Sequence, residues 1–370
     1  MTKVRHVLGI SGGKDSAALA IYLKNRHPEL DVEYYTCDTG RELNETYALI
    51  DRLESTLGKS ILKLQSVDLN NTMGQSPFDH FLDLYGGYLP SSSARWCTKK
   101  LKLDPFENYM GDEPTISYVG IRGDEDREGY ISKKQTVQSI FPFRKNIWSE
   151  DVIKLFLSNN AIANFKNLAV SFNADEHFLK IVDTAISVDF NLKQKANALL
   201  ESDTQLFNKI IFHLLKETDY PIGKLDSFPL IENEDVLKID DIFQILRDSG
   251  VGVPAYYEPM EYEAEIDGEI KKGVYNRSRS GCFFCFFQQK IEWVWLLEQH
   301  PKLFEAAMQY EKEGYSWMDN ETLVELKQPT RVAAIKKEHY IRTNAKASKS
   351  KNWQDQIMDA EGDGCASCFI

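Results

Sequence analysis

The chain opens with a strand, a glycine loop and a helix, and this unit limits the choice of fold more than any other feature. Residues 4–10 are rich in strand-forming side chains, residues 11–16 read SGGKDS, and residues 15–24 are rich in Ala and Leu. Two glycines let the backbone turn tightly and point its N–H groups at an anion, and the helix N-terminus adds a partial positive charge. The spacing is too short for the GxxxxGK[ST] loop of P-loop proteins. We therefore expect a phosphate loop of another kind.

Strand and helix patterns alternate over the first third of the chain. Strands are predicted over residues 4–10, 32–36, 61–67 and 116–121, and helices over residues 15–24 and 46–57. The alternation predicts an α/β fold with a doubly wound, mostly parallel sheet. Ligands of such sheets bind beyond the carboxyl ends of the strands, and the loops at those ends are rich in polar residues here. These loops are residues 11–16, 38–45 and 120–127.

Composition divides the chain into three parts. Residues 1–148 form the predicted α/β domain, residues 149–227 a helical insertion, and residues 228–370 a helical region with cysteine pairs and a basic segment. The insertion is rich in Asn, Lys, Leu and Phe and carries no recognisable chemistry. In the last part, Trp, Leu and Phe at helical spacing over residues 293–297 and 303–310 predict a stripe that faces the core.

The net charge is -12 over 370 residues, which argues against broad nonspecific affinity for nucleic acid. Residues 327–351 are an exception, because many Lys and Arg side chains there accompany a lone Glu338. This segment is interpreted either as a solvated helix face or as a local phosphate-binding surface. No apolar run approaches the roughly 20 residues that cross a bilayer, and the N-terminus lacks a signal-peptide pattern. We expect a cytoplasmic protein without membrane contact.

Charged residues after other predicted strands complete a candidate nucleotide site. Asp38, at a strand end, suits Mg²⁺ or a ribose hydroxyl. Arg122 and Arg127 suit a departing pyrophosphate or a substrate phosphate. Attack at phosphorus is catalysed mainly by positioning and charge neutralisation. Lys14, Asp38 and Arg122 are therefore the predicted catalytic residues.

Six cysteines are present, at Cys37, Cys97, Cys282, Cys285, Cys365 and Cys368. The last four form two CxxC pairs, which together can give a four-thiolate site for Zn²⁺ or for an iron–sulfur cluster. Such a site would also fix the C-terminal end of the chain, because structural metal binding contributes folding energy. The alternative for Cys365 and Cys368 is a frayed tail with free thiols or a redox pair.

Cys97 is a candidate sulfur carrier. It is close in sequence to Arg95, Lys99 and Lys100, and nearby positive charge lowers the pKa of a thiol. We therefore expect Cys97 to accept sulfur as a persulfide. Cys37 follows a predicted strand, and buried packing is the expected role.

These motifs together resemble the N-type ATP pyrophosphatase superfamily, and especially its phosphoadenosine-phosphosulfate (PAPS) reductase-like branch. The matching elements are SGGxDS at residues 11–16, DTG…ET at 38–46, R-x-C-T at 95–98 and GxRxDE at 120–125. The resemblance covers residues 1–130 well, residues 228–315 moderately and the insertion not at all. It implies ATP and Mg²⁺ as cofactors. The nucleotide-binding residues implied are Ser11, Gly12, Gly13, Lys14, Asp15, Ser16, Asp38, Thr39, Gly120 and Arg122.

Residues 277–290, RSRSGCFFCFFQQK, are similar to PAPS reductase-like components of DNA phosphorothioation and defence systems. The resemblance implies an ATP pyrophosphatase that adenylates an acceptor for sulfur transfer, with a cysteine desulfurase as the sulfur donor. DNA is the implied acceptor, reached directly or through partner proteins. Some relatives carry [4Fe–4S] clusters, which favours this cluster over Zn²⁺ on Cys282, Cys285, Cys365 and Cys368.

Three other functions remain open from the sequence. Sulfonucleotide reduction needs a nucleophile motif of the Glu-Cys-Gly-Leu-His type, whereas this sequence ends in DGCASCFI. A tRNA thiolation enzyme would use the same activation chemistry on another acceptor. A subunit that only senses ATP would bind the nucleotide without turnover.

Overall fold

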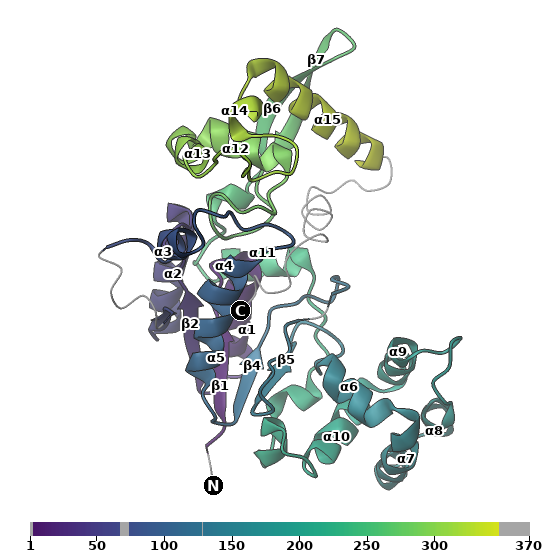
Figure 1. Cartoon of the computed structure of the whole chain (residues 1–370). Helices are drawn as coiled ribbons and strands as arrows, with labels where there is room; N and C mark the ends of the chain where they lie inside the picture. Colours follow the sequence, from purple (N-terminus) through teal and green to yellow (C-terminus); the bar gives the residue numbers. More distant parts are fainter. Residues whose placement is uncertain (1–2, 67–73, 128, 348–370) are drawn as a thin grey trace.

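A computed structural model describes residues 3–66, 74–127 and 129–347, and at its centre lies a five-stranded parallel sheet (Figure 1). The strands are β1 (Arg5–Gly9), β2 (Val32–Cys37), β3 (Ile61–Leu64), β4 (Thr115–Tyr118) and β5 (Val137–Ile140). Their order is β3-β2-β1-β4-β5, and every neighbouring pair is parallel. The chain thus passes from β1 to β2 and β3 on one side, and then crosses to β4 and β5 on the other. The predicted doubly wound α/β fold is confirmed.

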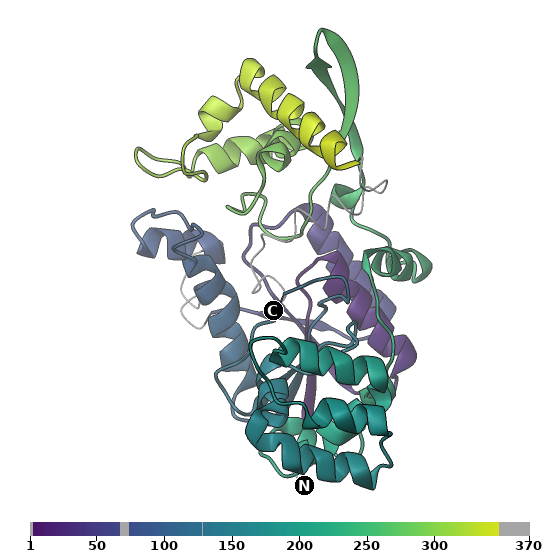
Figure 2. The ribbon, with the colours of Figure 1, turned by 90° about the vertical axis from the view of Figure 1, so that its right-hand side faces the viewer.

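Helices lie on both faces of this sheet (Figure 2). α1 (Lys14–Arg26) lies between the sheet and α11 (Ile239–Asp248). Apolar residues on most of its sides suit this position. α2 (Asn44–Leu57) is amphipathic, and its Leu49 and Leu53 are buried. The remaining helical elements of this part are α3 (Pro77–Leu84), α4 (Trp96–Thr98), a π-helical turn (Lys99–Leu103) and α5 (Asp104–Met110).

The sequence patterns predict β1 to β4 but not β5. β5 has four residues, including Gln138 and Ser139, and shows neither the apolar run nor the alternation that marks a strand. All of its residues are buried, and Oε1 of Gln138 accepts a hydrogen bond from the backbone N–H of Ile222 at 3.1 Å. Long-range pairing thus makes a polar strand stable inside the protein.

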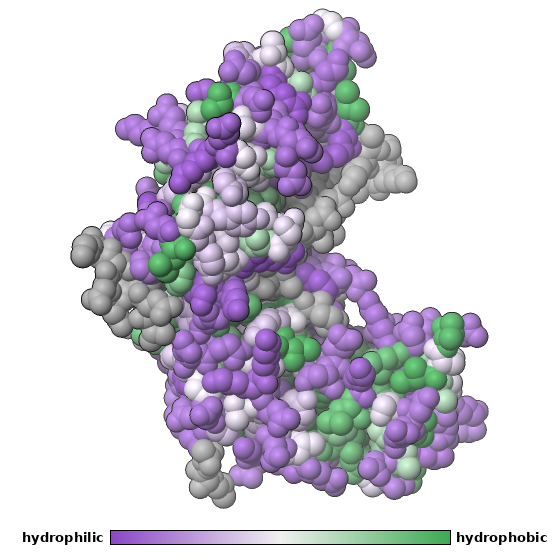
Figure 3. Space-filling view, in the orientation of Figure 1, coloured by the Kyte–Doolittle hydropathy of each residue, from purple (hydrophilic) through white to green (hydrophobic). Residues whose placement is uncertain are grey.

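Helices of the insertion lie beside the β5 edge of the sheet (Figures 1 and 2). They are α6 (Glu150–Leu157), α7 (Ile162–Ser171), α8 (Glu176–Asp183), α9 (Leu192–Ser202) and α10 (Thr204–Leu215). Their buried Phe165 and Phe207 belong to the same hydrophobic core as α1 and the sheet. Apolar residues also gather on the surface of this region, where Leu155 and Val170 are exposed (Figure 3). Because the core is shared, the division into three domains stays a prediction.

The C-terminal part packs around a second hydrophobic core. An antiparallel ribbon of β6 (Met260–Ile266) and β7 (Glu269–Tyr275) precedes α12 (Lys290–Gln299), α13 (Pro301–Met308), α14 (Leu323–Leu326) and α15 (Pro329–Ala347). Trp293 and Phe304 of the predicted stripe are fully buried in this core, which also contains Phe78 of α3.

Short 3-10 turns lie at Asn159–Ala161, Pro221–Lys224, Pro229–Glu232 and Ala255–Tyr257. Among the helices of the described ranges, none combines the length and the apolar character needed to cross a membrane.

A buried hydrogen bond ties the insertion to the chain that leaves β5, and its loss should destabilise the protein. The indole N–H of Trp148 donates to Oδ1 of Asn208 at 2.8 Å, and both side chains are buried. Asn208→Ala leaves this N–H without a partner, and a buried unpaired donor costs about 1–3 kcal/mol. We expect a loss of this size in the free energy of unfolding, measured by urea denaturation. Asn197→Ala, on the exposed face of α9, is the control with an expected change below about 0.5 kcal/mol. Equal effects of the two variants would contradict the prediction.

Candidate active site

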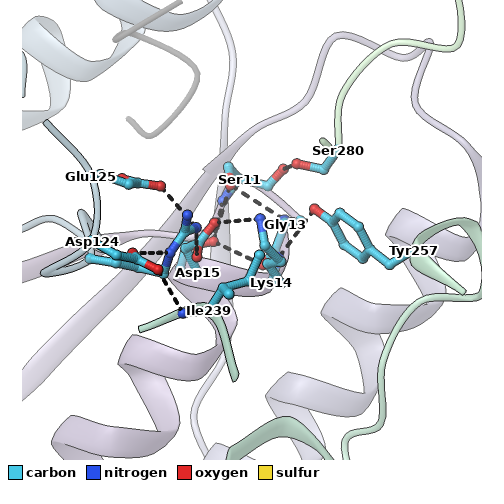
Figure 4. A network of polar contacts seen from close by, with 12 residues as sticks. Ser11, Gly13, Lys14, Asp15, Asp124, Glu125, Ile239, Tyr257 and Ser280 are labelled. Atoms are coloured by element: carbon cyan, nitrogen blue, oxygen red, sulfur yellow. Dashed lines mark hydrogen bonds and ion pairs between the residues drawn. The ribbon is translucent and has the colours of Figure 1, made fainter. Parts of the chain in front are cut away.

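The loop of residues 11–16 lies where β1 ends and α1 begins, at the carboxyl edge of the sheet (Figure 4). Gly13 precedes the first helical turn and offers no side chain to cap it. The Ser16 hydroxyl accepts a hydrogen bond from the backbone N–H of Ser11, and the two serine hydroxyls also lie 3.1 Å apart. These contacts keep the loop closed on itself. The helix N-terminus therefore faces the space between β1 and β4, where the strand order reverses and ligands of such sheets bind.

Two glycines allow close approaches around this loop. Gly12 has a φ of +72°, and a Cβ there would lie 2.3 Å from Cγ2 of Thr46 on α2. A Cβ on Gly120 would lie 3.0 Å from the backbone carbonyl of Asp15. Side chains at these positions would push α2 or the loop after β4 away from the start of α1. The sequence SGG…G is thus a requirement of packing as well as of backbone conformation.

Lys14 and Asp15 lie at the start of α1 (Figure 4), and together with Arg122 they form a buried cluster of charges. Nζ of Lys14 lies 3.1 Å from Oδ2 of Asp15, and Nη1 of Arg122 lies 2.8 Å from Oδ1. Arg122 also pairs with Asp124 at 2.9 Å and with Glu125 at 2.8 Å. Burial alone would raise the pKa of Asp15, but the charges of Lys14 and Arg122 outweigh it and lower the pKa to about 2. Asp15 therefore stays ionised at neutral pH and directs both cations.

A second polar cluster lies at the end of β2. Oδ1 of Asp38 accepts a hydrogen bond from the N–H of Gly40 at 2.8 Å. The Tyr47 hydroxyl lies within hydrogen-bonding distance of both Asp38 (2.9 Å) and Glu42 (3.0 Å), and the Thr39 hydroxyl donates to Glu42 at 2.7 Å. Burial raises the pKa of Glu42, and the charge of Asp38 adds to the rise. Sequence reasoning missed Glu42, because one acidic residue in a polar loop carries no local signal of burial.

Residues from the C-terminal part cover the loop of residues 11–16. The Tyr256 hydroxyl donates to the carbonyl of Gly12 at 3.0 Å, and the Tyr257 hydroxyl accepts from the N–H of Lys14 at 3.4 Å. The Ser280 hydroxyl donates to another carbonyl of the loop at 3.4 Å (Figure 4). Sequence reasoning missed these residues as well. Lys14 and Tyr257 are 243 positions apart, and no local pattern marks their contact.

A narrow cavity of about 20 Å³ lies between the loop, the end of β2 and residues 280–281. Its lining includes Ser11, Asp38, Glu42 and Lys102. A cavity of this size holds about one water molecule. This cavity by itself therefore has no room for a nucleotide.

The predicted nucleotide-binding residues lie along one edge of the sheet. Those of the loop surround the start of α1 together with Gly120 and Arg122. Asp38 faces the same small cavity as the loop, from the end of β2. Arg127 pairs with Glu125 at 2.7 Å, next to the Arg122 cluster.

The predicted metal ligands fall partly within the described residues. The backbone of Cys282 pairs with that of Glu42 in an isolated β-bridge, and the N–H of Cys285 donates to the Cys282 carbonyl at 3.1 Å. Within residues 3–66, 74–127 and 129–347, no group of three or more His, Cys, Asp or Glu side chains could hold a metal ion. Cys365 and Cys368 lie outside the described residues. The four-thiolate site therefore stays a prediction. Its first pair, Cys282 and Cys285, lies beside the end of β2.

A buried guanidinium next to Cys282 favours an anion at this position. Arg277 is 1% exposed, and its Nη2 donates to the Cys282 carbonyl at 3.2 Å. Its Nε and Nη1 have no hydrogen-bond partner in the described part of the chain. The Thr39 hydroxyl lies 3.2 Å from Sγ of Cys282. Because an uncompensated charge is costly to bury, these donors suit thiolates on a metal or a persulfide.

The lowered pKa expected for Cys97 is wrong. Burial raises the pKa of the Cys97 thiol to about 12. The neighbouring cations are engaged elsewhere: Arg95 lies over the ring of Phe287, 4.9 Å from its centroid, and Lys100 pairs with Asp104 at 3.0 Å. Desolvation therefore outweighs the charges that the sequence places nearby. The role of Cys97 as a sulfur carrier stays a prediction.

The basic segment lies largely on α15. Arg331 pairs with Glu321 at 2.5 Å, and Lys336 pairs with Glu298 at 2.6 Å. Residues 348–351 of the segment lie outside the described residues. Part of its charge is thus neutralised within the chain, and both interpretations of the segment stay open.

Replacement of Gly12 tests whether the loop needs its close contact with α2. Gly12→Ala combines a left-handed backbone with a clash against Thr46, whereas a Cβ on Gly58, at φ +67°, meets no atom within 4 Å. The left-handed conformation costs roughly 1–2 kcal/mol in both variants. We expect Gly12→Ala to lose at least about 1 kcal/mol more than Gly58→Ala in the free energy of unfolding. Thr46→Ser in the Gly12→Ala background removes the contacting methyl group and should recover part of the loss. Equal losses in the two alanine variants would contradict this packing.

In a comparison with known proteins, a family model matches the first part of the chain. Residues 5–166 match the family described as the phosphoadenosine phosphosulfate reductase domain. The match includes all five strands of the parallel sheet, the phosphate loop and Arg122. No match to a curated protein or to a solved structure was found. This match supports the PAPS reductase-like branch of the ATP pyrophosphatase superfamily, a family of enzymes that use sulfonucleotides or ATP.

Proposed function

We propose that the protein is an ATP pyrophosphatase that adenylates an acceptor for sulfur transfer in DNA phosphorothioate modification. The observation that carries the proposal is the loop of residues 11–16, with Lys14 and Arg122 held by Asp15 at the start of α1. Backbone N–H groups at a helix N-terminus and two directed cations suit the phosphates of ATP. The family match of residues 5–166 supports the use of a nucleotide.

The charge of the site favours Mg²⁺ as a second cofactor. Three carboxylates pair with Lys14 or Arg122, so these two cations are already compensated. A triphosphate adds more negative charge and needs further neutralisation. Asp38 and Glu42 offer carboxylate oxygens at the adjacent cavity, and oxygen is the ligand that Mg²⁺ prefers. Bound Mg²⁺ would supply charge neutralisation for the departing pyrophosphate.

Activation is a displacement at the α-phosphorus of ATP. An acceptor oxygen forms a bond to this phosphorus, the bond to the bridging oxygen breaks, and pyrophosphate leaves with the electron pair. Lys14 and Arg122 hold the leaving phosphates, and Asp15 keeps both cations in position. The terminal sulfur of a persulfide then displaces AMP from the acceptor. A second thiol breaks the remaining S–S bond, and an external dithiol reduces the disulfide that forms.

The cysteine pairs are proposed to hold a [4Fe–4S] cluster, with Zn²⁺ as the alternative. The proposed ligands are Cys282, Cys285, Cys365 and Cys368. Arg277 supports this assignment, because it is a buried cation beside Cys282 without a carboxylate partner in the described residues. A bound cluster would supply a fixed anchor for the segment that covers the phosphate loop. A cysteine desulfurase is the proposed sulfur donor, and DNA is reached through partner proteins in the cytoplasm.

Reduction of a sulfonucleotide is the second candidate, because the family match is to a reductase domain. That reaction needs a nucleophilic thiol. The sequence ends in DGCASCFI and lacks the Glu-Cys-Gly-Leu-His type of motif that supplies this thiol. Burial also raises the pKa of the Cys97 thiol to about 12, which disfavours a thiolate at that position. We expect no thioredoxin-dependent release of sulfite from PAPS, and sulfite release would replace the proposal by this alternative.

Product analysis tests the activity. The protein is incubated with ATP, cysteine, a desulfurase, a dithiol reductant and DNA, and pyrophosphate and AMP are measured. We expect both products in equal amounts and a decrease of at least about 100-fold in Lys14→Ala, because one donor to a developing anion contributes a factor of this order. Lys154→Ala, on the exposed face of α6, is the matched control and should behave as wild type. Undiminished pyrophosphate release in Lys14→Ala would show that Lys14 and its loop take no part in the reaction. ATP binding by the wild type without pyrophosphate release would instead indicate an ATP-sensing subunit.

Metal analysis tests the cysteine site. Cys282→Ser should lose bound iron or zinc, measured by elemental analysis, and visible absorbance should disappear if a cluster is present. Cys37→Ser is the control, because Cys37 packs in the apolar cluster around Phe106. The control should retain its metal. Wild-type metal content in Cys282→Ser would place the ligands elsewhere.

A further inference from the structure

The helix that follows the insertion, α11, begins beside the charge cluster of the candidate site (Figure 4). The backbone N–H of Ile239, the first residue of α11, donates to Oδ2 of Asp124 at 3.1 Å. The other oxygen of this carboxylate, Oδ1, accepts a hydrogen bond from Nε of Arg122 at 2.9 Å. One side chain thus joins the start of α11 to the buried guanidinium.

Backbone contacts hold the segment that leads into α11. The N–H of Gly123 donates to the carbonyl of Leu237 at 2.9 Å, and the N–H of Leu237 donates to the carbonyl of Phe143 at 3.0 Å. A Cβ on Gly123 would lie 2.3 Å from Cγ1 of Val236, which is closer than van der Waals contact allows. The start of α11 therefore has a defined position next to Asp124.

The carboxylate of Asp124 is suited to orient Arg122. A guanidinium group is planar, so contacts at two of its nitrogens define its plane. Asp15 contacts Nη1 of Arg122, and Asp124 contacts Nε. Asp124 is itself fixed by the N-terminus of α11, where the partial positive charge of the helix favours an anion.

α11 also reaches the other cation of the site. The ring of Phe243, on α11, lies edge-on to the ring of Tyr257, with 6.0 Å between the centroids. The Tyr257 hydroxyl accepts from the N–H of Lys14, and Nζ of Lys14 lies 5.2 Å from the centroid of the Tyr257 ring. Lys14 and Arg122 are thus each connected to α11 through one intermediate side chain.

We propose that α11 holds the two cations of the phosphate site in place, and that Asp124 is the positioning residue through which it orients Arg122. The contacts stand on the geometry alone, whereas their consequence for ATP rests on the proposed function. A shift at the start of α11 moves Asp124 and, with it, the guanidinium. Among the described residues, none of α11 lines the small cavity, so its influence on the site is indirect.

The test measures the affinity of the full chain for ATP in the presence of Mg²⁺, by isothermal titration calorimetry. Asp124→Ala breaks the link between α11 and Arg122. We expect about tenfold weaker binding, because a guanidinium that is no longer oriented loses part of its charge-assisted contact with phosphate. Asp241→Ala is the matched control, since the Asp241 carboxylate also accepts a backbone N–H at the start of α11, from Lys238 at 2.8 Å, but lies at an exposed position. This control should bind ATP as wild type does.

The direction of the change separates positioning from simple charge compensation. If Asp124 only offsets the charge of Arg122, its removal takes a negative charge away from the phosphates and should strengthen ATP binding. Tighter or unchanged binding by Asp124→Ala would therefore overturn the positioning role.

A second pair of variants tests the contribution of α11 and leaves Asp124 and Arg122 in place. Ile239→Pro removes the N–H that holds Asp124, and proline is well tolerated at the first position of a helix. The preceding Lys238 has φ -112° and ψ 177°, which suits a residue before proline. Ile239→Ala keeps the N–H and shares the loss of the side chain. We expect Ile239→Pro to bind ATP roughly threefold or more weakly than Ile239→Ala, and equal affinities would overturn the role of α11.

A double-mutant cycle distinguishes a failure of this role from a failure of the proposed function. If Asp124 acts through Arg122, Asp124→Ala should cause no further loss of affinity in an Arg122→Gln background. Additive losses would overturn the positioning role and leave the proposed function intact. Wild-type affinity in Arg122→Gln would contradict the proposed use of Arg122 and, with it, the role of Asp124. Circular dichroism shows whether each variant is folded, and the Ile239 pair decides the question should Arg122→Gln unfold.

Discussion

The ion pair between Asp15 and Arg122 is the contact on which the rest of the site depends. It joins the start of α1 to the loop after β4, across the point where the strand order of the sheet reverses. Both side chains are buried, and removal of one partner from such a pair costs about 3–5 kcal/mol, because the other charge is left in a medium of low polarity. Gly120 makes the approach possible, since its hydrogen faces the backbone of Asp15 where a methyl group would not fit. The fold and the candidate phosphate site are therefore held together by the same few residues.

Local patterns predicted the parts of this protein that form locally. The β1–loop–α1 unit could be predicted because strand propensity, two glycines and an apolar helix stand next to one another in the sequence. β5 could not, because its polar residues become stable only through contacts such as that between Gln138 and Ile222. The sequence therefore predicted most of the parallel sheet and the loop that precedes α1.

The missed parts of the site depend on contacts between distant residues or on burial. Tyr257 and Ser280 reach the phosphate loop from the far end of the chain, and neither is distinguished from its neighbours by type or spacing. Cys97 shows that burial, too, is not visible in the sequence. Its basic neighbours in sequence suggested an activated thiol, yet desolvation decides its pKa and cannot be read from a linear order of residues.

The covering of residues 11–16 has a consequence for the accessibility of Cys282. Ser280 rests on the loop, and Cys282 follows it by two residues in the same segment, packed against the end of β2. A shift of this segment away from residues 11–16 would also separate Cys282 from Glu42 and the end of β2. Under the proposed function, the entry of a nucleotide and the exposure of Cys282 are therefore coupled through one short stretch of backbone.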